Sequence, residues 1–132
     1  MNTTYFLNCV AGNVFGSKTT PALPSAYYLG LSATAPNVDG SGVKEPSATS
    51  GYTRVEIDGL SAPDNGVISN TKAIVFGEST SSWGVATHYV VYDSKSGGNL
   101  LMYGALEAPR TIDASTIVTI KDNCLVLTVF SK

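Results

Sequence analysis

The sequence predicts an all-β fold: an antiparallel β-sandwich or jelly-roll-like single domain of about seven or eight strands, with a short N-terminal helix. Short apolar or alternating segments recur along most of the chain, and clusters of Gly, Pro, Ser, Asn and Asp separate them. No alternation of helical and strand patterns supports a parallel α/β sheet. A length of 132 residues suits one domain whose core needs no disulfide or metal.

The first predicted element is a helix over residues 3–15. Phe6, Val10 and Val14 recur at helical spacing and place one apolar stripe along it. Two threonines at its start offer a capping side chain, and a glycine follows its end. Because so short a helix is marginal alone in water, we expect it to dock on another surface.

The β core is predicted over residues 26–132, and residues 1–25 form the helix and a linker arm that contains two prolines. Apart from the hairpin described next, strands are predicted over residues 26–34, 52–57, two short pieces of 67–76 broken near Asn70, 116–120 and 124–130. The last of these is apolar on both faces, which indicates a strand buried on both sides or placed at a subunit contact.

The strongest hairpin signal consists of two apolar runs, residues 88–92 and 100–103, around the turn-rich residues 93–99. Glycines supply positive φ in such a turn, and Asp, Ser and Asn side chains bond back to the local backbone. Pro109 is expected to end the second strand of this hairpin.

Composition excludes several function classes. The net charge is −2 and the basic residues are dispersed, so no nucleic-acid footprint is present. No apolar run is long enough to span a membrane, and the first residues do not resemble a secretory signal, so synthesis in a cytoplasm is expected. Only 14% of residues are charged, which favours a chain that covers much of its surface against copies of itself or a neighbour.

Candidate catalytic residues are few. His88 is the only histidine, and strict alternation places it on one strand face with Ala86 and Val90. Asp93 falls on the opposite face, so it is a poor local partner for a general base. The sequence contains neither GxSxG nor SxxK. We therefore predict a non-enzymatic protein without a cofactor or a metal site, and rank a small hydrolase last.

The two cysteines, Cys9 and Cys124, lie near opposite ends of the chain. Their spacing cannot establish a disulfide, although one is possible in principle. Buried free thiols that act as small hydrophobic groups are the favoured interpretation.

Trp83 supports two interpretations. Together with six of the seven tyrosines it could form an aromatic platform for sugars: Tyr27, Tyr28, Tyr52, Tyr89, Tyr92 and Tyr103. A core tryptophan with tyrosines at the edge of a sheet explains the same residues without a ligand, and we favour this second interpretation.

A set of short motifs runs through nearly the whole chain in a fixed order. They are LGLSATAP, a Glu-Pro pair before GYTRV, SNTKAIVF, SWG two residues before THY, and an Asp four residues before the start of GGNLL. In this combination the chain resembles a family of small bacteriophage virion structural proteins, commonly labelled tail-fibre or tail-fibre-like proteins.

The resemblance implies a non-enzymatic structural protein on the outside of the virion, tail-fibre-like or a capsid decoration protein. It also implies a homo-oligomer, a trimer or dimer, that contacts other phage capsid or tail proteins. A carbohydrate-binding module of a receptor-binding apparatus, contacting host surface glycans, is the alternative. The candidate interaction residues are Phe6, Val10, Val14, Trp83, Tyr89, Tyr92 and Lys95.

Overall fold

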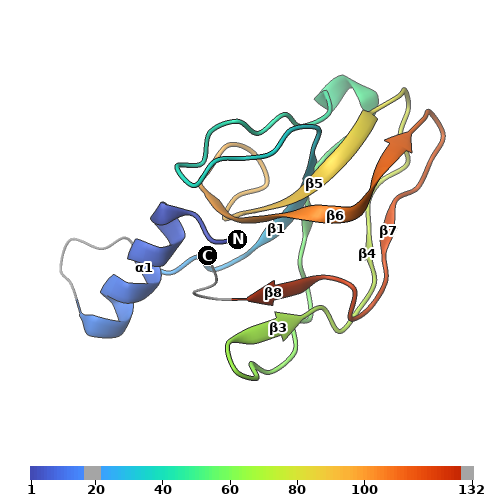
Figure 1. Ribbon diagram of the computed structural model, residues 1–132. Helices are drawn as coiled ribbons and strands as arrows, with labels where there is room; N and C mark the ends of the chain where they lie inside the picture. Colours follow the sequence, from blue (N-terminus) through green and yellow to red (C-terminus); the bar gives the residue numbers. More distant parts are fainter. Residues whose placement is uncertain (17–21, 129–132) are drawn as a thin grey trace.

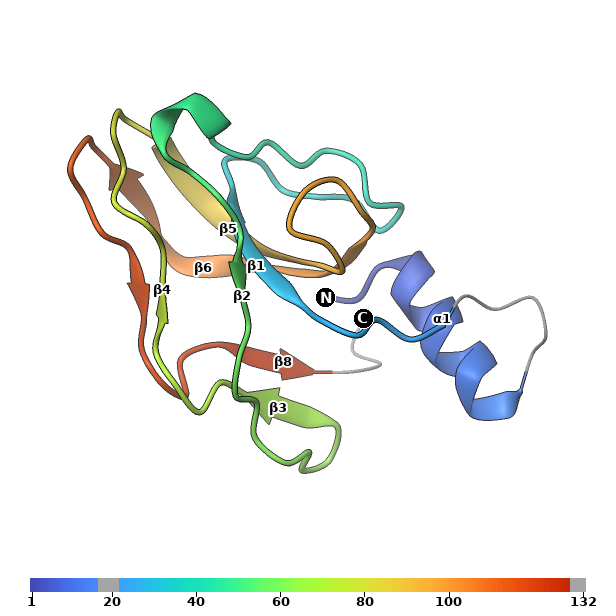
Figure 2. The same ribbon diagram turned by 180° about the vertical axis from the view of Figure 1, so that it is seen from behind.

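The computed structural model describes residues 1–16 and 22–128, and it confirms the predicted all-β class. Within these residues one α-helix, α1 (Thr4–Phe15), precedes eight strands, and a 3-10 turn, η1 (Ala48–Ser50), lies between the first two (Figures 1 and 2). The strands are β1 (Tyr28–Ser32), β2 (Val55–Glu56), β3 (Val67–Ser69), β4 (Ile74–Val75), β5 (Gly84–Tyr92), β6 (Leu100–Ile112), β7 (Thr119–Ile120) and β8 (Val126–Thr128). The predicted linker and last strand extend partly outside the described residues, at 17–21 and 129–130.

The larger sheet is antiparallel and has the strand order β2-β1-β5-β6. The predicted hairpin forms its centre and one edge, because β5 pairs with both β1 and β6. Two short ribbons, β3-β8 and β4-β7, face this sheet and form the second layer of a sandwich-like structure (Figure 1). The predicted break of residues 67–76 into two strands near Asn70 is confirmed.

The core lies between the two layers. Leu29, Val91 and Leu101 from the larger sheet are almost fully buried there with Phe76 from the second layer. Asn70 is also fully buried, where its side-chain amide donates to the carbonyls of Lys72 and Lys121 and its Oδ1 accepts from the Leu125 amide. This asparagine ties the two ribbons together at the point where each chain segment passes from one ribbon to the other.

The other face of the larger sheet is covered by irregular chain. Val90, Tyr92, Leu100 and Tyr103 form a second buried cluster on that face, and Val43 from the long loop packs against it. The sheet is therefore buried on both faces, which explains why β1 is buried almost throughout.

The expected end of the second hairpin strand at Pro109 is wrong, because β6 continues to Ile112. Its pairing with β5 changes register between His88, opposite Ala105, and Ala86, opposite Arg110. Pro109 falls in this irregular stretch and on an edge strand, so no ladder bond needs its missing N–H.

The same irregularity overturns the predicted face of Ala86. Strict alternation places it beside His88 and Val90, but Ala86 packs in the core between the layers while Val90 packs on the opposite face. A bulge changes the phase of a strand, and alternation cannot be carried across it.

Helix α1 has the predicted caps. The Thr3 hydroxyl accepts from the Phe6 amide, and Gly16 adopts φ 75° at the C-terminal end. The residues before the helix lie along the outer edge of β6: the Thr3 amide donates to the Leu101 carbonyl at 2.9 Å, and Tyr103 donates to Met1 at 2.9 Å. The helix is thereby attached to the sheet edge at its N-terminal end.

Cys9 and Cys124 are not joined by a disulfide. Cys9 is 1% exposed, as expected, but the predicted burial of Cys124 is wrong. Cys124 lies in a turn before β8, and Leu125 and Leu127 take the inward positions of the segment that follows. No helix in the described part of the chain has both the length and the apolar character needed to cross a membrane.

Candidate interaction surfaces

The predicted apolar stripe of α1 divides into a buried start and an exposed end. Phe6 is buried in the core, Val10 is half-buried, and Val14 is 67% exposed. Phe15, which follows Val14, is 86% exposed and was not among the predicted interaction residues. Val14 and Phe15 together are called the helix tip below.

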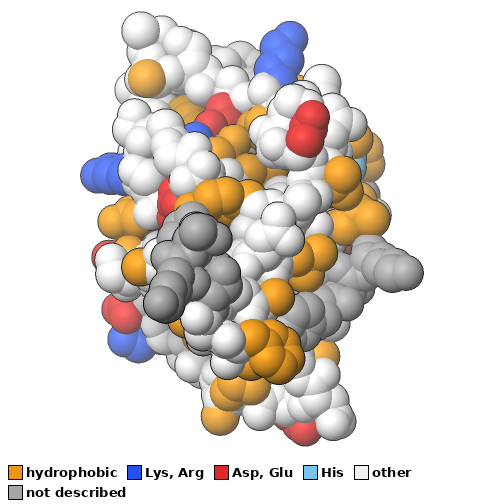
Figure 3. Space-filling view, turned by 90° about the vertical axis from the view of Figure 1, so that its left-hand side faces the viewer, with side chains coloured by type: hydrophobic (Ala, Val, Ile, Leu, Met, Phe, Trp, Pro, Cys, Tyr) orange, Lys and Arg blue, Asp and Glu red, His pale blue; other side chains and the backbone are white. Residues whose placement is uncertain are grey.

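The helix tip belongs to a helix without a charged residue, and it projects from one end of the molecule (Figure 1). Figure 3 looks onto this end and shows hydrophobic and uncharged side chains across its middle, with most charged ones toward its margin. A surface helix normally carries charged residues on its solvent face. An uncharged helix that ends in an exposed Phe is therefore a candidate contact surface.

Trp83 is buried, which confirms the core interpretation and overturns the aromatic platform. Its indole Nε1 donates to the Ser50 carbonyl at 2.9 Å. Tyr52 and Phe76 pack edge-on against it, with ring centroids 5.4 and 6.2 Å away. A flat sugar ring cannot stack on an indole that is enclosed in this way.

The two tyrosines predicted as interaction residues, Tyr89 and Tyr92, also pack against other parts of the protein. Tyr89 is half-buried and lies over Gly104, where a Cβ atom would come 2.6 Å from the tyrosine ring. Tyr92 is buried, and the guanidinium of Arg54 covers its ring at 3.5 Å from the centroid.

Arg54 forms the most extensive polar cluster of the described residues. Its Nε and Nη2 donate to the Glu45 carboxylate at 3.0 and 2.6 Å, and its Nη1 donates to the carbonyls of Ser94 and Gly97. The Tyr52 hydroxyl donates to the same carboxylate and accepts from the Leu31 amide. Arg54 is only 8% exposed, so it is a buried arginine whose donors are used within the protein.

The electrostatics of Glu45 follow from this cluster. Burial alone would raise the pKa of its carboxyl group, but the hydrogen bonds from Arg54 and Tyr52 and the charge of Arg54 outweigh burial and hold the pKa below its usual value. Burial and the neighbouring carboxylate raise the pKa of Tyr52, so this phenol stays protonated. Arg54 and Glu45 therefore form an ion pair at neutral pH, and this pair holds the neighbouring chain in place.

The chain that Arg54 holds is the loop of residues 93–99, which carries the predicted contact residue Lys95. Arg54 fixes two of its carbonyls, and Asp93 Oδ1 accepts from the Asn99 amide at 2.7 Å. Lys95 is exposed on this ordered loop, beside a depression of about 380 Å³ that Glu45 and Arg54 also line.

His88 and Asp93 do not meet. His88 Nδ1 lies 2.8 Å from the hydroxyl of Thr87, and Asp93 is engaged with Asn99. Across residues 1–16 and 22–128, no three His, Cys, Asp or Glu side chains gather as metal ligands would. The hydrogen bonds of both residues are thus local and structural.

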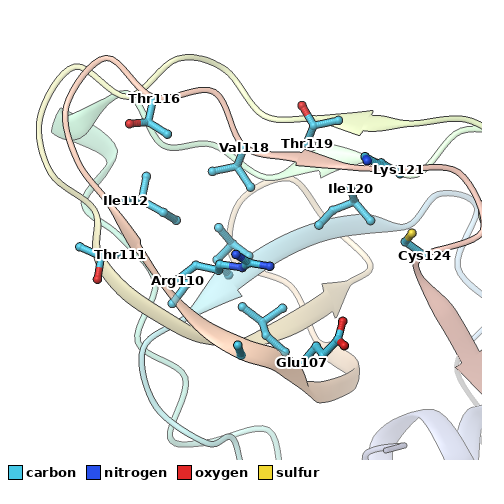
Figure 4. A pocket seen from close by; sticks show the side chains of 14 residues that line it. Glu107, Arg110, Thr111, Ile112, Thr116, Val118, Thr119, Ile120, Lys121 and Cys124 are labelled. Atoms are coloured by element: carbon cyan, nitrogen blue, oxygen red, sulfur yellow. The ribbon is translucent and has the colours of Figure 1, made fainter.

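A further surface feature is a groove between the two layers, called the inter-sheet groove below (Figure 4). It has a volume of about 570 Å³, and a second cavity of about 300 Å³ shares part of its lining and continues it toward β8. Leu31, Ala86 and Ile112 form its buried floor, and Figure 4 shows Val118 and Ile120 pointing into it from the β7 segment. Its charged and thiol-bearing lining residues are Glu107, Arg110, Lys121 and Cys124.

Sequence reasoning missed the Arg54–Glu45 pair, the helix tip and the inter-sheet groove. The only signal for the pair in the sequence is that Arg54 lies in a predicted strand shortly after Glu45 and Pro46. Phe15 is signalled by its place beside Val14 at the end of an uncharged helix. The groove depends on how separate ribbons pack, which no local pattern encodes.

The structure is that of a small β-sandwich protein with an exposed apolar helix tip and a groove between its layers. Residues 2–128 match the family of the podophage GP4 fiber I protein gp80, so the chain belongs to this phage fibre family. Among curated proteins no match is found. The predicted likeness to tail-fibre proteins is confirmed, and membership implies a structural role in the virion.

Proposed function

We propose that this protein is a non-enzymatic subunit of a fibre on the tail of the phage particle, and that it assembles as a homo-oligomer through α1. Family membership supports the fibre role. The observation that carries the assembly role is the 86% exposure of Phe15 at the end of a helix without charge. Leaving a large aromatic side chain in water forgoes about 2 kcal/mol of burial free energy.

A second copy suits this surface because the surface is uncharged. The protein has a net charge of −2, so two copies repel weakly overall. α1 contains no charged residue, so burying its end against another copy requires no charge to be desolvated. Attachment to other particle proteins then occurs through the oligomer.

The ordered loop of residues 93–99 supports a role outside the particle. Arg54 and Asp93 hold this loop in one conformation, so Lys95 and its neighbours form a defined contact surface. Host glycan binding through Trp83 is not part of the proposal, because that side chain is enclosed.

Light scattering coupled to size exclusion tests the proposal on the purified wild-type chain. We expect a defined oligomer at micromolar concentration, whose mass is a whole multiple of 13.7 kDa. A monomer at every concentration would contradict assembly through this chain's own surfaces.

A further inference from the structure

We propose that the helix tip of one copy inserts into the inter-sheet groove of a neighbouring copy, in a head-to-tail contact. This inference rests on the proposed homo-oligomer and specifies how it forms. It joins two features of a single copy: an exposed apolar projection and a cavity with an apolar floor and a partly polar rim.

The groove is open because of the topology. β6 is the edge strand of the larger sheet, and the second layer consists of two separate ribbons, so within residues 1–16 and 22–128 no strand closes the space between β6 and β7. Leu106, Val118 and Ile120 line this space and remain partly exposed. A concave site of about 570 Å³ with an apolar floor falls within the size range of protein pockets that enclose a ligand.

The tip and groove of one copy lie apart. α1 projects from one end of the molecule, whereas β7 lies toward the opposite end in both ribbon views (Figures 1 and 2). Intramolecular filling of the groove by its own helix is therefore ruled out by the geometry, and the tip is available to another chain.

Charge favours the same pairing. The C-terminal end of a helix carries a partial negative charge, and α1 has no basic residue in its last turn to balance it. Arg110 and Lys121 lie at the groove, and neither takes part in the ion pairs found among the described residues, which are Arg54–Glu45 and Lys72–Asp58. Glu107 also lines the groove, so its three charged residues sum to a net positive charge. Arg110 extends into the open space in Figure 4, where it can donate to terminal helix carbonyls.

Val14 and Phe15 expose on the order of 300 Å² together. Insertion into the groove covers this surface and the groove lining at the same time, whereas a contact between two helix tips leaves the groove unfilled. A contact between two different surfaces of identical chains closes into a ring such as a trimer, or extends as a row.

The native Cys124 provides a direct test, because it is exposed and lines the groove. The variant Val14→Cys places a thiol at the helix tip and keeps Phe15 as the anchor. After mild oxidation with copper phenanthroline, we expect disulfide-linked species larger than a dimer on a non-reducing gel. The double variant V14C/C124S should give none, and the matched control Val75→Cys, which places a thiol at another exposed valine, should not form the ladder.

Each alternative result has a distinct meaning. Cross-linked dimers that persist in V14C/C124S would show a symmetric tip contact and overturn the docking. No cross-link in V14C, with an oligomer still present by light scattering, would also overturn the docking but leave the proposed function standing. A groove-filling variant, Ala108→Trp, gives a second test: we expect loss of the oligomer with an unchanged circular dichroism spectrum, and an intact oligomer would contradict the docking.

Discussion

Arg54 shows at the scale of one residue how a polar side chain is accommodated inside this fold. Arg54 immediately precedes β2, is 8% exposed, and binds a carboxylate, two loop carbonyls and the face of a tyrosine. The sequence predicted the burial of Trp83 correctly, because a large apolar side chain is stabilised by burial. It did not predict the burial of Arg54, because a buried ion pair depends on a partner that only the fold brings close.

Replacing Arg54 by Ala should destabilise the protein by about 2–3 kcal/mol, since the half-buried Glu45 carboxylate loses its partner and two loop carbonyls lose their donor. The matched variant Arg54→Lys keeps a charge but cannot reproduce the forked contacts, so we expect an intermediate loss. Urea unfolding measures both changes. Equal stability of wild type and R54A would show that the cluster contributes nothing to the fold.

The Glu45 carboxyl gives a pH prediction. Its pKa is lower in the folded protein than in the unfolded chain, so its stabilisation is present above the unfolded value of about 4.3 and is lost as pH falls through the folded value. The stability difference between wild type and Glu45→Gln should therefore shrink on acidification below about pH 4. Urea midpoints of the two proteins between pH 7 and pH 3 measure this difference, and a constant gap would argue against the assignment.

At the scale of secondary structure, local signals predicted the elements and packing set their limits. The caps of α1 and the β5–β6 hairpin follow from threonine, glycine and turn residues in the sequence. The extension of β6 past Pro109 does not, because it depends on an edge position and on a register change opposite β5. The length of β2 likewise depends on packing, because a strand extends only where a neighbouring strand is available to pair with it.

Gly30 in β1 offers a prediction at this scale. A Cβ atom there would lie 2.5 Å from the Tyr52 hydroxyl and 3.1 Å from a Val90 methyl group, on a strand buried on both faces. Gly30→Ala should therefore cost about 1–3 kcal/mol of stability through overpacking. The double variant G30A/Y52F removes the closest atom and should recover part of the loss, which a double-mutant cycle by urea unfolding measures. Strict additivity would contradict the proposed clash.

The whole molecule has an enclosed core and two unfilled apolar features, the helix tip and the inter-sheet groove. Neither feature is needed to complete the β-sandwich, because the core between the layers is buried without them. In the proposed fibre subunit, the helix tip and the inter-sheet groove would be contact sites, since repeated contacts between identical chains build an extended structure. The low charge of the sequence favours such contacts, but the proposed positions of the contacts depend on the arrangement of all elements.

Oligomer loss on changing the helix tip is the prediction that belongs to this scale. Phe15→Ser should convert the oligomer to a monomer because it removes the largest exposed apolar side chain of the contact. Val75→Ser removes apolar surface from a half-exposed position on β4 and should leave the oligomer intact. Light scattering on both variants decides the matter, and an oligomeric F15S protein would place the contact elsewhere.

Mass spectrometry of heads and tails separated from purified phage particles tests the central claim most directly. The proposed role as a fibre subunit on the tail predicts that this protein is found in the tail fraction and in more than one copy per tail. Absence from purified particles, or recovery with the heads alone, would contradict the account.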